Sequence, residues 1–166
     1  QATGEHWPVF HKAWAGLVEV IRQDADNIVI CAGGYWAHDL VGVRDRLVED
    51  SRTVYAWHSY PNAERGDFAA RLATLDGLQD VKPIIVTEWG FCPECTDDLR
   101  GTVDDFGRPF VEDFLDKYQM SHTAWCFSRG AMPNLLDAGD GPSAYGRFVQ
   151  AMLKRSSASA AWQPAR

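Results

Sequence analysis

Long apolar runs are missing from this 166-residue sequence. The longest, such as Ile28–Ala32 and Pro83–Val86, are far shorter than the ~20 residues that a helix needs to span a bilayer. An excess of positive charge is missing as well, because 16 Lys and Arg stand against 23 Asp and Glu, for a net charge of -7. Without a basic field to attract phosphates, the chain is expected to bind neither nucleic acid nor an anionic membrane.

An initiator Met is also missing, and the first residues contain no apolar segment of a signal peptide. We therefore expect an N-terminus that has been processed or truncated, so the lack of a secretion signal carries no information about location. There is no long low-complexity tract, and with 46% apolar and 23% charged residues the composition is that of a globular protein. We expect one domain over residues 1–155, followed by a small, polar tail over residues 156–166.

Cysteine is scarce, with four residues in the whole chain, of which Cys92 and Cys95 form a CxxC pair. No second CxxC or Cys/His pair completes a set of zinc ligands. The pattern leaves three alternatives open, which are a disulfide (Cys92–Cys95 or a longer-range one), free thiols and a structural zinc. A metal site is not part of the predicted function.

Alternating strands and helices are the main feature of the apolar pattern. Four short apolar, β-branched or aromatic runs predict buried strands: Asn27–Ala32, Thr53–Trp57, Pro83–Thr87 and Thr123–Phe127. Helical segments are predicted around them: Val9–Arg22, Val41–Glu49, Asp67–Leu78, Pro109–Tyr118 and Ser143–Arg155. This order predicts an α/β fold with a parallel sheet covered by helices. Since a (β/α)8 TIM barrel needs about 250 residues, the four units amount to half of such a barrel.

Polar and aromatic residues follow every predicted strand. The four clusters are Gly33-Gly34-Tyr35-Trp36, Trp57-His58-Ser59-Tyr60, Thr87-Glu88-Trp89-Gly90 and Trp125-Cys126-Phe127-Ser128. In (β/α)8 enzymes the active site lies at the carboxyl ends of the strands. The clusters therefore predict a site at that end of the sheet.

In their order and spacing these clusters resemble glycoside hydrolase family 5, the cellulase and mannanase group of clan A. Glu88-Trp89-Gly90 resembles the end of strand seven, where the family's Glu is the nucleophile, and His58-Ser59-Tyr60 matches the His-x-Tyr after strand six. Three further segments are similar to the end of strand five, to the Trp of strand eight and to the lead into the last helix: Gly33–Leu40, Ala124–Phe127 and Pro133–Gly146. The family's acid/base is a Glu preceded by Asn after strand four, and this sequence contains no Asn-Glu pair.

The resemblance implies the C-terminal half of a retaining β-glycoside hydrolase barrel, strands five to eight, from an endoglucanase-like or mannanase-like enzyme. It implies an extracellular protein that needs no cofactor. Its partners would be a β-linked polysaccharide or oligosaccharide substrate and the missing N-terminal half-barrel. Without the acid/base, the chain by itself is expected to be inactive.

Each candidate residue has an expected role. Glu88 is expected to be the nucleophile, with the Tyr60 hydroxyl donating a hydrogen bond to it. His58 is expected to orient a sugar hydroxyl or to position the acid/base. Trp125 and Trp36 are expected to bind substrate, because an aromatic face packs well against a pyranose ring.

Two alternatives from other functional classes remain. A non-catalytic carbohydrate-binding module would use Trp36 and Trp125 while Glu88 stays idle. A structural half-barrel would self-associate to close its sheet. We expect the face that would then be covered to include Val29, Ile85, Trp125, and Tyr55 or Trp57.

Overall fold

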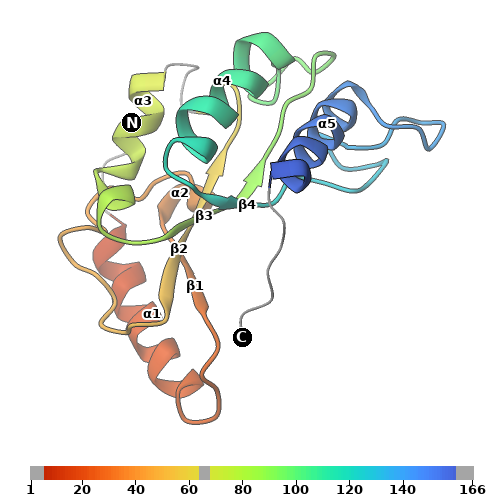
Figure 1. Cartoon of the computed structure of the whole chain (residues 1–166). Coiled ribbons are helices and arrows are strands. Elements are labelled where there is room, and N and C mark those ends of the chain that lie inside the picture. Colours follow the sequence, from red (N-terminus) through yellow and green to blue (C-terminus); the bar gives the residue numbers. More distant parts are fainter. Residues whose placement is uncertain (1–5, 64–67, 160–166) are drawn as a thin grey trace.

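The computed structural model describes residues 6–63 and 68–159. Its centre is one sheet of four parallel strands in sequential order, which confirms the predicted α/β class and parallel sheet (Figure 1). The strands are β1 (Val29–Ala32), β2 (Thr53–Ser59), β3 (Ile84–Trp89) and β4 (Ser121–His122). None of the helices in the described ranges has both the length and the apolarity to cross a bilayer.

The helices lie between and beside the strands in the chain. They are α1 (Trp7–Ile21), α2 (Gly34–Ala37), α3 (Phe68–Leu75), η1 (Leu78–Asp80), η2 (Val103–Gly107), α4 (Arg108–Phe110), η3 (Val111–Asp116) and α5 (Ala144–Ser159). The run from η2 to η3 starts six residues before the predicted helix Pro109–Tyr118. A capping box explains this early start, because the Thr102 hydroxyl accepts from the Asp105 amide at 3.2 Å and the Asp105 carboxylate accepts from the Thr102 amide at 2.5 Å.

The predicted helix Val41–Glu49 is wrong, since this segment forms turns. Gly42 has a φ of 80°, which a helix does not allow. Two of its amides also donate to side chains outside the segment, Gly42 to Asp76 at 3.0 Å and Val48 to the Tyr55 hydroxyl at 3.0 Å. These tertiary hydrogen bonds take the place of helical ones.

The predicted position of the fourth strand is also wrong, because β4 ends before the run Thr123–Phe127. The chain still follows β3, since the Trp125 amide donates to the Trp89 carbonyl at 3.0 Å. At Cys126 it turns away, and that amide donates to the Pro133 carbonyl at 2.9 Å. The aromatic run is therefore a loop beside the sheet.

The last helix extends beyond the predicted boundary at residue 155 and ends at Ser159. Ala and Ser continue it, and no Gly or Pro interrupts the sequence before Pro164. The remainder of the expected tail, residues 160–166, lies outside the described residues, as does Asp67 at the start of the predicted helix Asp67–Leu78.

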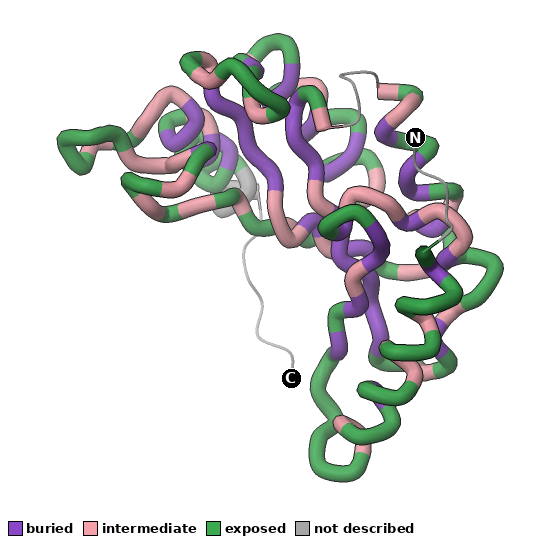
Figure 2. Tube along the Cα trace, turned by 180° about the vertical axis from the view of Figure 1, so that it is seen from behind, coloured by how far each residue is buried: buried purple, intermediate pink, exposed green. Residues whose placement is uncertain are grey.

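The core lies between the sheet and its helices, where the strands are most deeply buried (Figure 2). Trp57 is fully buried, and its ring centroid lies 5.3 Å from that of Phe114 and 5.8 Å from that of Phe110. Val29 and Tyr55 are buried on this helix-covered side too, so the expectation that Val29, Tyr55 or Trp57 belongs to an uncovered face is wrong. The error arises because a short apolar run without polar alternation does not reveal which of its sides meets the helices.

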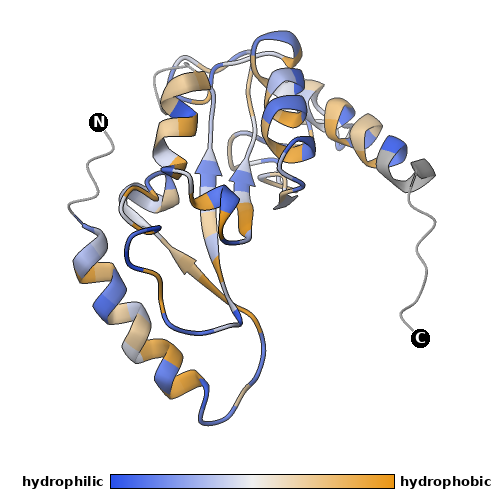
Figure 3. Cartoon of the chain, turned by 60° about the vertical axis from the view of Figure 1, so that its left-hand side comes forward, coloured by the Kyte–Doolittle hydropathy of each residue, from blue (hydrophilic) through white to orange (hydrophobic). Residues whose placement is uncertain are grey.

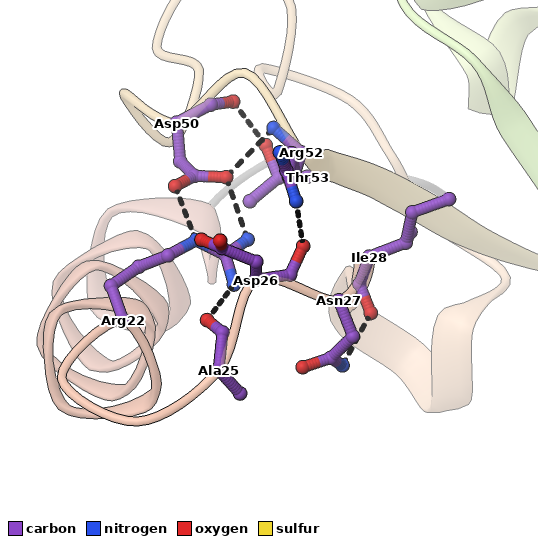
Figure 4. A network of polar contacts seen from close by, with 8 residues as sticks. All are labelled: Arg22, Ala25, Asp26, Asn27, Ile28, Asp50, Arg52 and Thr53. Carbon is purple, nitrogen blue, oxygen red and sulfur yellow. Dashed lines mark hydrogen bonds and ion pairs between the residues drawn. The ribbon is translucent and has the colours of Figure 1, made fainter.

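A polar network joins the end of α1 to the segment before β2 (Figure 4). The Arg22 guanidinium binds both carboxylate oxygens of Asp50, at 2.8 and 3.0 Å, and so holds the pKa of Asp50 below its ordinary value. The Asp50 carbonyl accepts from the Thr53 hydroxyl at 2.9 Å. This network fixes α1 beside the sheet.

Apolar side chains remain exposed where β1 forms the edge of the sheet. Ile28 is 59% exposed and Ile30 41% exposed, and Leu17 and Val20 on α1 are more than half exposed. Figure 3 shows hydrophobic, orange stretches along α1. β1 pairs with β2 alone, so its outer side is an edge. Edges and patches of this kind are normally covered in soluble proteins.

Expressed by itself, the 166-residue chain is therefore expected to self-associate through this edge. Size-exclusion chromatography with light scattering should give a mass above that of one chain. Ile30→Lys should shift the protein towards the monomer, because a charged edge resists pairing. Val81→Lys is the matched control, because Val81 is 48% exposed but lies outside the strands. This substitution should not shift the protein towards the monomer. A monomer at every concentration would contradict the expectation.

Candidate active site

A register shift between β2 and β3 positions Glu88. Trp57 pairs with Val86, but the next residue, His58, pairs with Glu88, so Thr87 is an extra residue in β3. Without this shift Glu88 would have the same orientation as Val86, which is buried against the helices. The shift turns Glu88 to the side of His58, and its side chain is 26% exposed there. Bulges beside active sites redirect side chains in this way.

Two side chains contact the Glu88 carboxylate. One comes from β2 and the other from the residue that directly follows β2. The Tyr60 hydroxyl donates to Glu88 Oε2 at 2.9 Å, which confirms the hydrogen bond expected from the sequence. His58 Nδ1 lies 3.4 Å from the same oxygen. Because both contacts use Oε2, Oε1 is the oxygen left to face a ligand.

Tyr60 remains a hydrogen-bond donor over the whole working pH range. Burial raises the pKa of the Tyr60 phenol well above its ordinary value, and the nearby Glu88 charge raises it further. A phenol that keeps its proton stabilises the ionised form of the carboxylate that it contacts.

His58 is neutral at neutral pH. Burial lowers the pKa of His58, and His38 lowers it further, while the Glu88 charge opposes both effects. The effect of burial is the largest of the three. The 3.4 Å contact with Glu88 is therefore between a neutral imidazole and a carboxylate.

His38 is a member of the site that the sequence did not reveal. Its ring meets that of His58 edge to face, with centroids 5.9 Å apart, and lies 5.9 Å from the Tyr60 ring. A left-handed turn over Tyr35–Ala37 (φ 49°, 54° and 65°) brings it back over the sheet. This conformation costs roughly 1–2 kcal/mol per residue in non-glycine residues, and no sequence pattern predicted it here.

Gly33 allows this turn to close. A Cβ built on Gly33 would lie 2.1 Å from the Asp39 carbonyl oxygen, which is too close for any side chain. The Gly34 amide donates to the same carbonyl at 3.0 Å. The first glycine of the sequence cluster, Gly33, is therefore required by a close backbone approach.

Trp89 packs beneath the site. It is fully buried, and its indole Nε1 donates to His122 Nδ1 at 3.3 Å. The Tyr145 hydroxyl donates to the Trp89 carbonyl at 2.5 Å. Gly90 has no room for a side chain, since a Cβ would meet Pro133 at 2.6 Å and Tyr145 at 2.9 Å. The backbone after Glu88 is thus held on several sides.

The two tryptophans expected to bind substrate are both exposed. Trp125 is 38% exposed and is tied to the site through its backbone, as described for the loop after β4. Trp36 is 89% exposed on the left-handed turn. Among the ring pairs of the described residues, neither tryptophan is paired with His58 or Tyr60.

The cysteine alternatives resolve into one disulfide and two thiols. Cys92 and Cys95 are bonded, and Cys31 and Cys126 are free. Burial raises the pKa of Cys31 to about 11. In the described ranges, no group of three or more His, Cys, Asp or Glu side chains has the arrangement of a metal site.

Two substitutions beside His58 should shift the pKa of this residue in opposite directions. In an NMR titration of the folded protein, the pKa of His58 should lie below the ordinary 6.5. Glu88→Gln should lower this pKa further, because it removes a charge that favours the protonated ring, whereas His38→Asn should raise it. Burial also lowers the pKa of His122, which serves as a control that neither substitution should move. Shifts of the same sign in both variants would contradict this electrostatic picture.

Comparison with known proteins finds that the chain is similar to endoglucanases. No family model matches the chain. Endoglucanase N of Pectobacterium atrosepticum is 29% identical over 122 residues, which cover 66% of this chain and 24% of that protein. Endoglucanase A of Evansella cellulosilytica is 26% identical over 151 residues, which cover 84% of this chain and 30% of that protein. The chain thus spans less than a third of the length of these relatives.

Solved structures show the same fold over a larger share. A β-glucanase from Saccharophagus degradans, solved in complex with cellotetraose, superposes with a TM-score of 0.78 at 24% identity. The match covers 90% of this chain and 48% of the β-glucanase chain, so four parallel strands correspond to about half of a family 5 barrel. The resemblance seen in the sequence is confirmed: the chain is a homologue of the cellulase and endoglucanase-like catalytic domains of glycoside hydrolase family 5, over roughly half of their solved length.

Proposed function

We propose that the chain supplies the nucleophile of a retaining β-glycoside hydrolase. In this proposal β1 to β4 are strands five to eight of the barrel, and the acid/base belongs to the half that precedes them. The observation that carries it is the hydrogen bond of 2.9 Å from Tyr60 to Glu88, at the carboxyl ends of two adjacent parallel strands. That end of the sheet is where enzymes of this fold perform their chemistry.

The reaction would proceed by double displacement. Glu88 Oε1 attacks the anomeric carbon, the glycosidic bond breaks, and the leaving oxygen takes a proton from an acid on the other half-barrel. The same group, now a base, removes a proton from water, which attacks the anomeric carbon and releases Glu88. Retaining enzymes hold the two carboxyl groups about 5–5.5 Å apart. In this proposal the second carboxyl group comes from the other half of the barrel.

The residues around Glu88 would prepare it for attack. Tyr60 binds one carboxylate oxygen and favours the anion, which leaves the other oxygen free to act as nucleophile. His58 is neutral, so it can donate or accept a hydrogen bond with a sugar hydroxyl or with the acid/base without adding a positive charge. Substrate remains bound through these contacts while the bond breaks.

The substrate we propose is a β-linked glucan. The relatives described above are endoglucanases, and the β-glucanase was solved with a four-sugar β-glucan fragment. Trp125 and Trp36 have exposed rings near the carboxyl ends of the strands and can pack against pyranose faces. Since such polymers lie outside cells, we also propose an extracellular protein.

A non-catalytic half-barrel that self-associates is the second candidate. The exposed apolar edge at β1, with Ile28 and Ile30, favours it. The two functions are distinguished by the kinetics of variants of the full-length protein that contains this chain.

In that full-length protein, Glu88→Gln should fold normally and lower kcat on a soluble β-glucan by several orders of magnitude, because no covalent intermediate can form. Tyr60→Phe should lower kcat by about 10–1000-fold, the range for losing one charge-assisted hydrogen bond at a reacting group. Glu94→Gln, on the disulfide loop that follows β3, is the control and should change kcat little. A fully active Glu88→Gln variant would end the proposal.

The isolated 166-residue chain should release no reducing sugar from β-glucan or β-mannan above background, since no acid is placed at the leaving group. Measurable retaining activity of the isolated chain would instead require an acid within it, such as Glu94 or Asp97.

A further inference from the structure

A buried arginine lies behind the residue that contacts Glu88. Arg71 on α3 is 1% exposed. Its Nη2 donates to the Tyr60 carbonyl at 3.3 Å and to the Pro61 carbonyl. Both carbonyls follow the last residue of β2, where the sheet provides no further ladder partner. Buried carbonyls at such a point need another donor, and a charged guanidinium is a strong one.

Aromatic rings fix the direction of this guanidinium. Arg71 Cζ lies 4.9 Å from the centroid of the Phe106 ring and 5.5 Å from that of Phe68. Phe106 is itself buried in η2, so the guanidinium plane is held between α3 and η2. A lysine would keep the charge but lose the planar stacking and the fixed fork of donors.

The next residues are held from the other side by the loop that follows Glu88. The Asn62 amide donates to the Asp98 carbonyl at 2.9 Å, and the Asn62 side chain donates to the Arg100 carbonyl at 3.1 Å. Gly101 lies so close to Pro61 that a Cβ would come within 2.6 Å of the proline ring. The segment after β2 is therefore fixed between Arg71 and the loop that follows β3.

We propose that Arg71 is a positioning residue for the candidate nucleophile. By holding the carbonyls of Tyr60 and Pro61, it sets the path of the backbone from which the Tyr60 phenol reaches Glu88 Oε2. The inference rests on the proposed function of Glu88 and adds to it a residue that does not touch substrate. A merely structural arginine would stabilise the fold with no particular effect on Tyr60.

A double-mutant cycle in the full-length protein separates these two roles. Arg71→Met should lower kcat about 10–100-fold with KM nearly unchanged, because small misplacements of a catalytic group have effects of this size. Arg71→Lys should recover part of this loss. When Tyr60 is already Phe, Arg71→Met should lower kcat less than about twofold, since Arg71 then has no phenol to position.

Thr74→Val is the matched control. Thr74 lies on the same helix with 6% exposure, and its hydroxyl donates to the Arg71 carbonyl at 2.7 Å, within α3 itself. Thr74→Val should leave kcat unchanged whether residue 60 is Tyr or Phe. An equal loss from Arg71→Met with Tyr60 or Phe at that position would overturn the proposal.

A readout without activity keeps this inference distinct from the proposed function. In a crystal structure of the Arg71→Met protein, Tyr60 Oη should move beyond hydrogen-bond distance of Glu88 Oε2, from the 2.9 Å of the unchanged protein, while the Trp57 core stays in place. If Arg71→Met does not fold, Arg71→Lys is subject to the same cycle and the same distance measurement. An unchanged distance from Tyr60 Oη to Glu88 Oε2 refutes the positioning role. An active Glu88→Gln variant refutes the proposed function but does not affect this distance measurement.

Discussion

One hydrogen bond, from the Tyr60 phenol to the Glu88 carboxylate, depends on the register of two neighbouring parallel strands. The extra residue Thr87 in β3 turns Glu88 out of the helix-covered core and towards the side of His58. Burial keeps the proton on the Tyr60 phenol, so the carboxylate always meets a donor. Arg71 then fixes the backbone of the donor, and the buried Trp89 lies under the backbone of the acceptor.

The parallel sheet could be read from the sequence because its buried strands are continuous apolar runs. The location of the site followed, since parallel strands bring their carboxyl ends to one edge of the sheet. Tyr60, His58 and Glu88 could therefore be grouped in advance. Their contact through one oxygen, Oε2, required the register shift, and local residue patterns do not specify such a shift.

Other features depended on tertiary contacts that no local pattern encodes. His38 reaches the site through a left-handed turn that only the surrounding hydrogen bonds sustain. Segment 41–49 has the composition of a helix but donates its amides to Asp76 and Tyr55. Arg71 is a charged residue on α3, and its burial is decided by the carbonyls and rings around it.

The open edge at β1 and the need for a second carboxyl group beside Glu88 have the same explanation in the proposed function. A covering half-barrel would bury Ile30 and would also bring the second carboxyl group that a retaining mechanism needs. In the proposed function, one missing half-barrel would therefore complete both the packing and the chemistry. The Oε1 atom of Glu88 is the point at which the two halves would act together.

The most direct test is covalent trapping in the full-length protein. A 2-deoxy-2-fluoro-β-glucoside or cellobioside with a good leaving group forms a glycosyl-enzyme that hydrolyses slowly, and peptide mass spectrometry locates the sugar. The account predicts a single added fluoroglycosyl group on the peptide that contains Glu88, and none in the Glu88→Gln variant. A fluoroglycosyl group on any other carboxylate would contradict it.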